Sequence, residues 1–294
     1  MKILLTGKNG QVGFELRRSL AVLGEVVAVG GGDCDLRDQV ALRRLIRHHN
    51  PNIIVNPAAY TKVDNAEVEG DCAYQVNAVA PGILAEEANK IGAILVHYST
   101  DYVFDGTKKA DYFEDDRPLP LNIYGATKLA GEIAVRSATD RHLILRTSWV
   151  YGARGKNFPK TMLRLAGERE SLNVVADQFG APTSAGTLAD LTAHTLINWI
   201  KNPSGFPYGL YHSSASGLTN WYEYACYVVE RAREYKTNIT AVNCSIRPIA
   251  SSDYPTAAKR PLYSKLDTAK LKNTFGLTLP DWKVSVDHFL DQIL

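Results

Sequence analysis

Three side chains that can move a proton lie close together in this sequence: Thr100, Tyr124 and Lys128. A tyrosine and a lysine four residues apart lie on the same face of a helix, one turn from each other. A nearby ammonium group favours tyrosinate and so lowers the pKa of the phenol. Moving that pKa from about 10 to about 7 takes about 4 kcal/mol, which a lysine, a hydroxyl donor and a cationic cofactor ring can supply together. Tyr-x-x-x-Lys also occurs on many solvated helix faces, so the rest of the chain has to decide its meaning.

The composition is that of an ordinary globular protein, with 294 residues, 45% of them hydrophobic and 22% charged. This length suits one large α/β unit or two closely joined domains. The 33 basic and 31 acidic residues nearly balance, which argues against nucleic acid or a membrane surface as partner. No apolar run is long enough for a transmembrane helix or a signal peptide, and the four scattered cysteines favour a reducing compartment. We therefore expect a cytoplasmic protein.

The N-terminus carries a glycine turn between a strand and a helix. Ile3 to Leu5 reads as a buried strand, Gly7, Gly10 and Gly13 follow at three-residue spacing, and residues 14–23 have helical periodicity. Small residues at such a turn allow a pyrophosphate to approach the backbone at the helix N-terminus, where free N–H groups and the dipole favour an anion. The position directly behind a buried strand favours a dinucleotide site.

The first half alternates strands and helices. Further strands are predicted at residues 26–29, 53–55, 93–97 and 143–145, and helices at 38–49, 76–91 and 124–139. This rhythm predicts a Rossmann-type, doubly wound parallel α/β sheet with right-handed crossovers. Ligands bind outside the carboxyl ends of such strands, so the glycine turn, the loop at 59–61 and Thr100 should share one edge.

Beyond residue 152 the alternation loosens. Helices are predicted at 157–166, 187–201, 220–235 and 281–294, and short strands near 172–175 and 209–212. We predict a dinucleotide-binding domain at 1–152 and a smaller, mixed α/β, mainly substrate-binding domain at 153–294, some segments of which fold back onto the first. Basic residues in the second half are candidates for contact with a diphosphate: Lys160, Arg164, Arg247, Lys259, Arg260 and Lys265.

The glycine turn, Thr100 and the Tyr124/Lys128 pair together resemble the extended short-chain dehydrogenase/reductase superfamily. Within it, the chain is most similar to the dTDP-4-dehydrorhamnose reductase family, through the runs 99–104 and 177–183 above all. This resemblance implies NADPH- or NADH-dependent reduction of the C4 ketone of dTDP-4-dehydro-β-L-rhamnose to dTDP-β-L-rhamnose, for surface polysaccharide. It further implies that Tyr124 is the proton donor, that Thr100 helps to set its pKa and that Lys128 also holds the nicotinamide ribose.

The resemblance assigns the remaining contacts as well. It implies that the cofactor is bound by Gly7, Gly10, Gln11, Val12, Gly13, Asp35, Leu36, Ala59, Tyr60, Thr61, Tyr98, Tyr124 and Lys128. It implies that the sugar nucleotide is bound by Thr100, Asp101, Trp149 and Arg260.

Two features bear on the cofactor and on assembly. Some family members carry an acid at the tip of the second strand, where this chain has Gly30. An acid there accepts ribose hydroxyls and repels a 2′-phosphate, so its absence favours NADPH over NADH, and Lys8 is a candidate to help bind the 2′-phosphate. Asp33 and Asp35 are the nearby candidates to accept the ribose hydroxyls. We expect no catalytic metal, although some relatives bind magnesium at a subunit contact through a glutamate placed like Glu15. A homodimer is the expected assembly.

Other activities on this scaffold are distinguished by single residues. Dehydratases of the superfamily place a glutamate directly after the Thr-Asp pair, where this chain has Tyr102. Another nucleotide-sugar 4-ketoreductase or an epimerase remains open, because epimerases share threonine, tyrosine and lysine. A cofactor-binding regulatory subunit is the alternative from another class. The sequence contains no Gly-x-Ser-x-Gly nucleophile elbow and no paired histidine spacing for a metal.

Overall fold

A six-stranded parallel sheet forms the centre of the protein, seen in a computed structural model that describes residues 1–235 and 244–294. The strand order is β10-β5-β4-β3-β1-β2, and every neighbouring pair is parallel. The strands are β1 (Lys2–Leu5), β2 (Glu25–Ala28), β3 (Ile53–Asn56), β4 (Ile94–Thr100), β5 (His142–Thr147) and β10 (Gly209–His212). The predicted Rossmann-type α/β class is confirmed.

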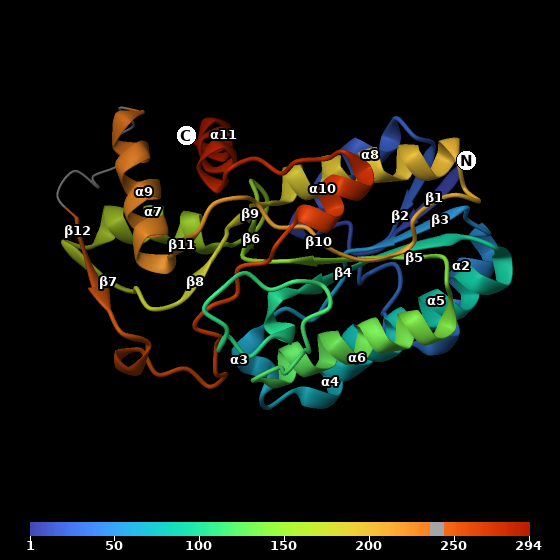
Figure 1. Cartoon of the computed structure of the whole chain (residues 1–294), viewed down its shortest axis with the longest axis horizontal. Coiled ribbons are helices and arrows are strands. Elements are labelled where there is room, and N and C mark those ends of the chain that lie inside the picture. Colours follow the sequence, from blue (N-terminus) through green and yellow to red (C-terminus); the bar gives the residue numbers. More distant parts are fainter. Residues whose placement is uncertain (236–243) are drawn as a thin grey trace.

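Helices cover both faces of this sheet (Figure 1). One face carries α1 (Gln11–Ala21), α8 (Ala185–Lys201) and α10 (Ala269–Phe275). The other carries α2 (Gln39–His49), α5 (Ala80–Ile91) and α6 (Ile123–Ala138). Because both faces are covered, the strands are nearly continuous runs of Ile, Leu and Val, and β3 is buried along its whole length.

Two elements of the second half complete the sheet. Strand β10 pairs in parallel with β5, and α8 packs against α1 on the face lined by Leu16 and Leu20. The strand at 209–212 was predicted from its sequence, but its membership of the central sheet was not. The division at residue 152 stays a prediction.

The rest of the second half gathers at the carboxyl end of the sheet (Figure 1). Its helices are α7 (Phe158–Glu168), α9 (Trp221–Glu234) and α11 (Trp282–Ile293), which enclose an aromatic core. Short strands pair as β7 (Ser171–Val175) with β12 (Ser245–Ile249), β6 (Val150–Tyr151) with β9 (Thr183–Ser184), and β8 (Phe179–Gly180) with β11 (Thr219–Asn220). Sequence periodicity missed β12 and α10. Among the described residues, no helix has the length and apolar character needed to cross a membrane.

One long helical run contains a widened turn. After the short α3 (Val63–Ala66), α4 (Gly70–Tyr74) continues through a π-helical turn (Gln75–Val79) into α5. The π-helical turn presents Asn77, which is fully buried. Such turns inside α-helices occur frequently at functional sites.

Candidate active site

A cleft of about 660 Å³ lies at the carboxyl edge of the sheet. It is lined by the residues that follow β1, β3, β4 and β5, together with the N-terminal part of α6 and Trp221 of α9. Predicted site residues in its wall are Gly7, Gly10, Gln11, Val12, Ala59, Thr61, Tyr98, Thr100, Asp101, Tyr124, Lys128 and Trp149. The structure therefore brings most of the predicted site together at the edge that the topology required.

The glycine turn is built for close approach of the backbone. Gly7 adopts φ +63°, a left-handed conformation that favours glycine. A Cβ on Gly13 would lie 2.1 Å from the carbonyl oxygen of Gly7, so only glycine lets α1 begin this close to the turn. Gly10 precedes α1, no side chain caps the helix, and Gln11 and Val12 face the cleft. The free backbone N–H groups of this helix N-terminus fit the pyrophosphate of a dinucleotide.

Thr100 and Tyr124 meet where β4 ends and α6 begins. The side chain of Asn122 caps α6 by accepting from Gly125 N at 2.8 Å. A Cβ on Gly125 would lie 2.2 Å from the carbonyl oxygen of Tyr102, so this glycine allows the helix to approach the loop after β4. The Tyr124 and Tyr102 rings then meet edge to face, with centroids 5.8 Å apart.

Burial dominates the electrostatics of Tyr124. Desolvation raises the pKa of its phenol to about 12, while the neighbouring Thr100 hydroxyl acts in the opposite direction. The expected lowering of the tyrosine pKa is therefore not produced by the protein groups around it, and Lys128 is not among the groups that shift it. The phenol is held protonated at neutral pH, which is the form an acid needs.

Lys128 is a buried amine directly under the cleft. Its Nζ donates to the carbonyl oxygen of Tyr98 at 2.5 Å, and only 2% of the residue is exposed. Burial lowers the pKa of Lys128 to about 8, and the carboxylate of Glu132, one helical turn further on, opposes this shift. Glu132 is itself held by Arg146 through two hydrogen bonds of 2.9 and 2.7 Å.

Several polar atoms in the cleft wall are left without a partner in the described part of the chain. They are Ser99 Oγ, Asp101 Oδ2 and Thr147 Oγ1, all buried. Burial raises the pKa of Asp101 to about 7, although the hydrogen bond from the Thr100 hydroxyl to its other oxygen, Oδ1, acts against this. Buried polar atoms normally have partners, so these three fit a cleft that receives a polar ligand.

Asn77 fixes the loop predicted for the middle of the cofactor. Its Oδ1 accepts from Tyr60 N at 2.8 Å, and its Nδ2 donates to Tyr60 O at 3.0 Å and to Thr127 Oγ1 at 3.1 Å. The loop thereby presents Ala59 and Thr61 to the cleft, while the Tyr60 hydroxyl donates to Glu69 outside it. Sequence reasoning assigned Asn77 no role.

The predicted adenosine end lies past β2. Asp35 pairs with Arg37 at 2.6 Å, and Leu36 packs against the core under α2 and α5. Asp33 accepts from Gly30 N at 2.8 Å and from Lys8 Nζ at 2.6 Å. The hydrogen bond from Lys8 lowers the pKa of Asp33, so this side chain is a carboxylate at neutral pH.

A second cavity of about 980 Å³ adjoins the cleft and shares Trp221 with it. It lies between α7, β7 and the segment after β12. Arg260 lines this cavity rather than the cleft, and its guanidinium donates to Asp64 Oδ2 at 2.7 Å and Oδ1 at 3.2 Å.

The six candidate basic residues divide in two groups. Lys259 and Arg260 line the second cavity. The others lie elsewhere: Lys160 donates to the carbonyl oxygen of Ala153, Arg164 pairs with Glu168, Arg247 is exposed on β12, and Lys265 is buried and donates to Ala215 O.

Trp221 was missed by sequence reasoning. It stacks on Trp149, with ring centroids 3.7 Å apart and planes 10° from parallel. At the start of an amphipathic helix, an aromatic residue gives the same signal as a core residue, so no local pattern distinguishes it.

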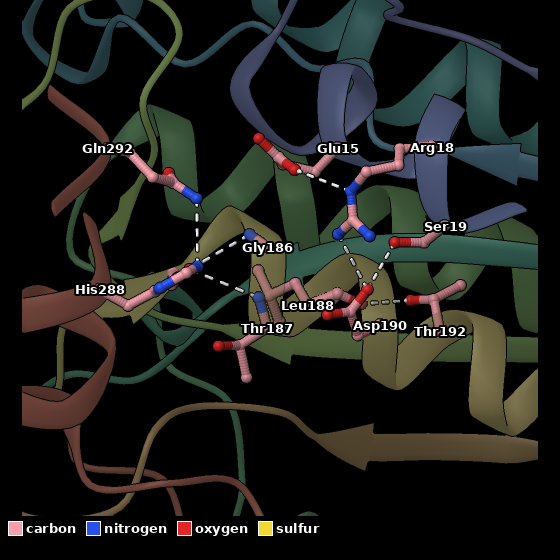
Figure 2. A network of polar contacts seen from close by, with 11 residues as sticks. Glu15, Arg18, Ser19, Gly186, Thr187, Leu188, Asp190, Thr192, His288 and Gln292 are labelled. Carbon is pink, nitrogen blue, oxygen red and sulfur yellow. Dashed lines mark hydrogen bonds and ion pairs between the residues drawn. The ribbon is translucent and has the colours of Figure 1, made fainter.

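Glu15, the residue compared with a magnesium ligand of some relatives, is engaged by an arginine in this structure. Figure 2 shows the Glu15 carboxylate directed at Arg18, whose guanidinium also contacts Asp190. Asp190 further accepts from Ser19 Oγ at 2.6 Å. Among the described residues, no group of three His, Cys, Asp or Glu side chains is placed to hold a metal ion. An arginine between two carboxylates balances the charge that a cation would otherwise balance.

Comparison with known proteins gives full-length matches. The family model of the RmlD substrate binding domain matches residues 1–294. A dTDP-4-dehydrorhamnose reductase of Burkholderia thailandensis is 48% identical over 288 residues, 97% of each chain. The crystal structure of a dTDP-4-dehydrorhamnose reductase from Clostridium acetobutylicum has TM-score 0.90 at 36% identity, covering 100% of this chain and 99% of that one. The enzyme of the same name from Bacillus anthracis, in complex with NADP, has TM-score 0.89 at 36% identity, covering 99% of both chains.

Proposed function

Because this chain belongs to the family of the RmlD substrate binding domain, we propose that it is a dTDP-4-dehydrorhamnose reductase. It reduces the C4 ketone of dTDP-4-dehydro-β-L-rhamnose to dTDP-β-L-rhamnose with a nicotinamide cofactor, the last step in making this nucleotide sugar. The observation that carries the proposal is that Thr100, Tyr124 and Lys128 gather in one cleft beside a dinucleotide-type glycine turn.

The cleft fits the cofactor. Gly7, Gly10, Gln11 and Val12 would hold the pyrophosphate, and Lys128 the nicotinamide ribose. The bound nicotinamide supplies the hydride for C4. The buried polar atoms of Ser99 and Thr147 have hydrogen-bonding capacity left for a ligand in this cleft.

Tyr124 protonates the alkoxide that develops at C4. A phenol with a pKa of about 12 stays protonated at neutral pH and can still donate to a more basic alkoxide. The Thr100 hydroxyl lies beside Tyr124 and stabilises the same oxygen as negative charge appears. Lys128 adds a positive charge under the site while its amine is protonated.

The second cavity would receive the nucleotide. It shares Trp221 with the cleft and carries Lys259 and Arg260, so a diphosphate placed there meets two cations. Arg260 is already oriented by Asp64, which leaves part of its fork of donors for phosphate oxygens.

NADPH is accepted at least as well as NADH in this proposal. Gly30 leaves the tip of β2 without a carboxylate of its own, and Lys8 lies beside it in contact with Asp33. A 2′-phosphate would compete with Asp33 for the Lys8 ammonium.

A homodimer in the cytoplasm is the proposed working form, and the thiols of all four cysteines are free. Magnesium has no role in the proposed reaction because Arg18 already engages Glu15 and Asp190.

The test is an assay in which dTDP-4-dehydrorhamnose is generated in situ and loss of NADPH and NADH is followed at their common absorbance band. Wild type should oxidise the cofactor only with substrate present and should release dTDP-β-L-rhamnose. Tyr124→Phe should lower kcat by about 10²–10⁴ while binding NADPH normally. No substrate-dependent oxidation by wild type would refute the reductase assignment, and undiminished activity of Tyr124→Phe would refute the assigned acid.

A further inference from the structure

The run from Asp177 to Thr183 is prominent in the sequence, yet none of the proposed chemical steps uses it. No residue of this described run is among those that line the catalytic cleft, and Gln178 alone among them lines the second cavity. Its side chains and backbone instead contact or orient the indoles of Trp149 and Trp221.

Gln178 holds one edge of the Trp221 indole. Trp221 Nε1 donates to Gln178 Oε1 at 3.1 Å, and Gln178 Nε2 donates to Ser251 Oγ at 2.9 Å. Asp177 fixes Ser251 by accepting from its Oγ at 2.6 Å and from its backbone N at 3.0 Å. Because an indole has a single donor, a fixed acceptor sets the direction of its N–H edge, and the stacking on Trp149 sets the ring plane.

Gly180 makes room for the other indole. A Cβ on Gly180 would lie 2.8–2.9 Å from ring carbons of Trp149, so any other residue would displace that ring. Trp149 itself has φ +48°, a left-handed conformation uncommon outside glycine. Neighbouring contacts hold the segment there, including Ser148 Oγ donating to Ala181 O at 2.7 Å. Strained backbone of this kind is concentrated at ligand sites.

The two indoles stack face to face in the wall of the cleft. They stack at 3.7 Å and both line the cleft, and Trp221 also lines the cavity. Stacking covers one face of each indole, and Phe158 packs against Trp221 with ring centroids 4.7 Å apart, so Trp149 is the ring that can meet a sugar in the cleft. The apolar C–H face and the methyl group of a 6-deoxysugar suit a large flat apolar surface.

We propose that Trp221 is a positioning residue: its indole, stacked on Trp149, holds the Trp149 ring where that ring contacts the sugar. Asp177, Gln178 and Gly180 are positioning residues that act through these rings. The inference rests on the proposed function, since it takes the ligand to be a nucleotide-linked deoxysugar.

The test distinguishes binding of the sugar from binding of the nucleotide. Binding of dTDP-β-L-rhamnose and of dTDP is measured by calorimetry with NADP⁺ present. The proteins compared are wild type, Trp221→Ala, Trp221→Phe and the matched control Trp199→Phe. In wild type the Trp199 indole donates to Tyr208, outside both cavities. Trp221→Ala should weaken dTDP-β-L-rhamnose by about tenfold and dTDP by less than about threefold, and Trp221→Phe should restore most of the loss. Equal weakening of both ligands, or no weakening of either, would overturn the assignment.

Gln178→Ala provides an independent arm with both indoles retained. It should raise KM for dTDP-4-dehydrorhamnose with little change in kcat, and Gln178→Glu, which keeps the acceptor for Trp221, should lower KM again. An unchanged KM in Gln178→Ala would overturn the positioning role. Failure of the proposed reaction would appear in wild type as absence of turnover, whereas failure of the Trp221 assignment leaves wild-type turnover intact.

Discussion

Lys128→Met is expected to stabilise the protein while it abolishes efficient reduction. Burial lowers the pKa of Lys128 from 10.5 to about 8, so below pH 8 the folded protein carries a buried charge that the unfolded chain exposes to water. A pKa change of this size corresponds to about 3 kcal/mol of destabilisation. The substitution also loses the hydrogen bond to Tyr98 O, which contributes about 1 kcal/mol. Methionine is close in length and apolar, so a net gain of about 1–2 kcal/mol in the free energy of unfolding is expected.

The pH dependence of this gain identifies its cause. Between pH 8 and about pH 10.4 the unfolded chain binds the proton that folded wild type has released, so wild-type stability rises with pH and the advantage of methionine disappears. Thermal unfolding at pH 7 should show Lys128→Met melting about 2–5 °C above wild type, and at pH 10 little or no difference. Lys272→Met, an exposed lysine on α10, is the control and should change little at either pH. A lower melting temperature for Lys128→Met at pH 7, or a gain that does not depend on pH, would refute the reasoning.

Three further predictions concern ligands. Asp33→Asn should free Lys8 to bind a 2′-phosphate. The ratio of kcat/KM for NADPH to kcat/KM for NADH should then rise by about tenfold, and Kd for NADPH should fall in parallel. An unchanged ratio would mean that Lys8 does not reach the phosphate. As pH rises through about 7, Asp101 becomes charged in the cleft and KM for the anionic substrate should rise. Asp101→Asn should give a flat KM between pH 6 and pH 7, where Lys128 is still mostly protonated, and an equal rise in this variant would refute the role of Asp101. Incubation with EDTA should leave both activity and sedimentation behaviour unchanged, because Arg18 balances Glu15 and Asp190; loss of either would show that a metal binds there after all.

The sheet was predictable where the signal is local. Runs such as Ile53–Val55 are apolar because both faces of a parallel strand are buried, so they stand out in the sequence. Strand β10 shows where such prediction ends. Its residues indicate a strand, but no local sequence pattern indicates that this strand pairs with β5. Strand β12 was missed because exposed Ser245, Arg247 and Pro248 interrupt the apolar alternation.

In the functional site, too, residues placed by local structure were predictable and residues that act across long sequence separations were not. The glycine turn and the Tyr124/Lys128 pair were predictable because one turn and one helix set their spacing, and Thr100 was predictable because it ends a recognisable buried strand. Asn77 and Trp221 were not, since each acts across a long separation in sequence, on Tyr60 and on Trp149. The pKa of Tyr124 was also missed, because the degree of burial decides it and the residue types alone do not.

The late position of β10 in the chain has a consequence for biosynthesis. When residues 1–152 have left the ribosome, the outer edge of β5 still lacks its neighbour, and α1 still lacks the helix that covers Leu16 and Leu20. An unpaired strand edge next to uncovered apolar side chains is a template for aggregation. The nascent chain therefore cannot complete its nucleotide-binding half until residue 212 has emerged, and a fragment cut at residue 152 should associate with itself rather than fold.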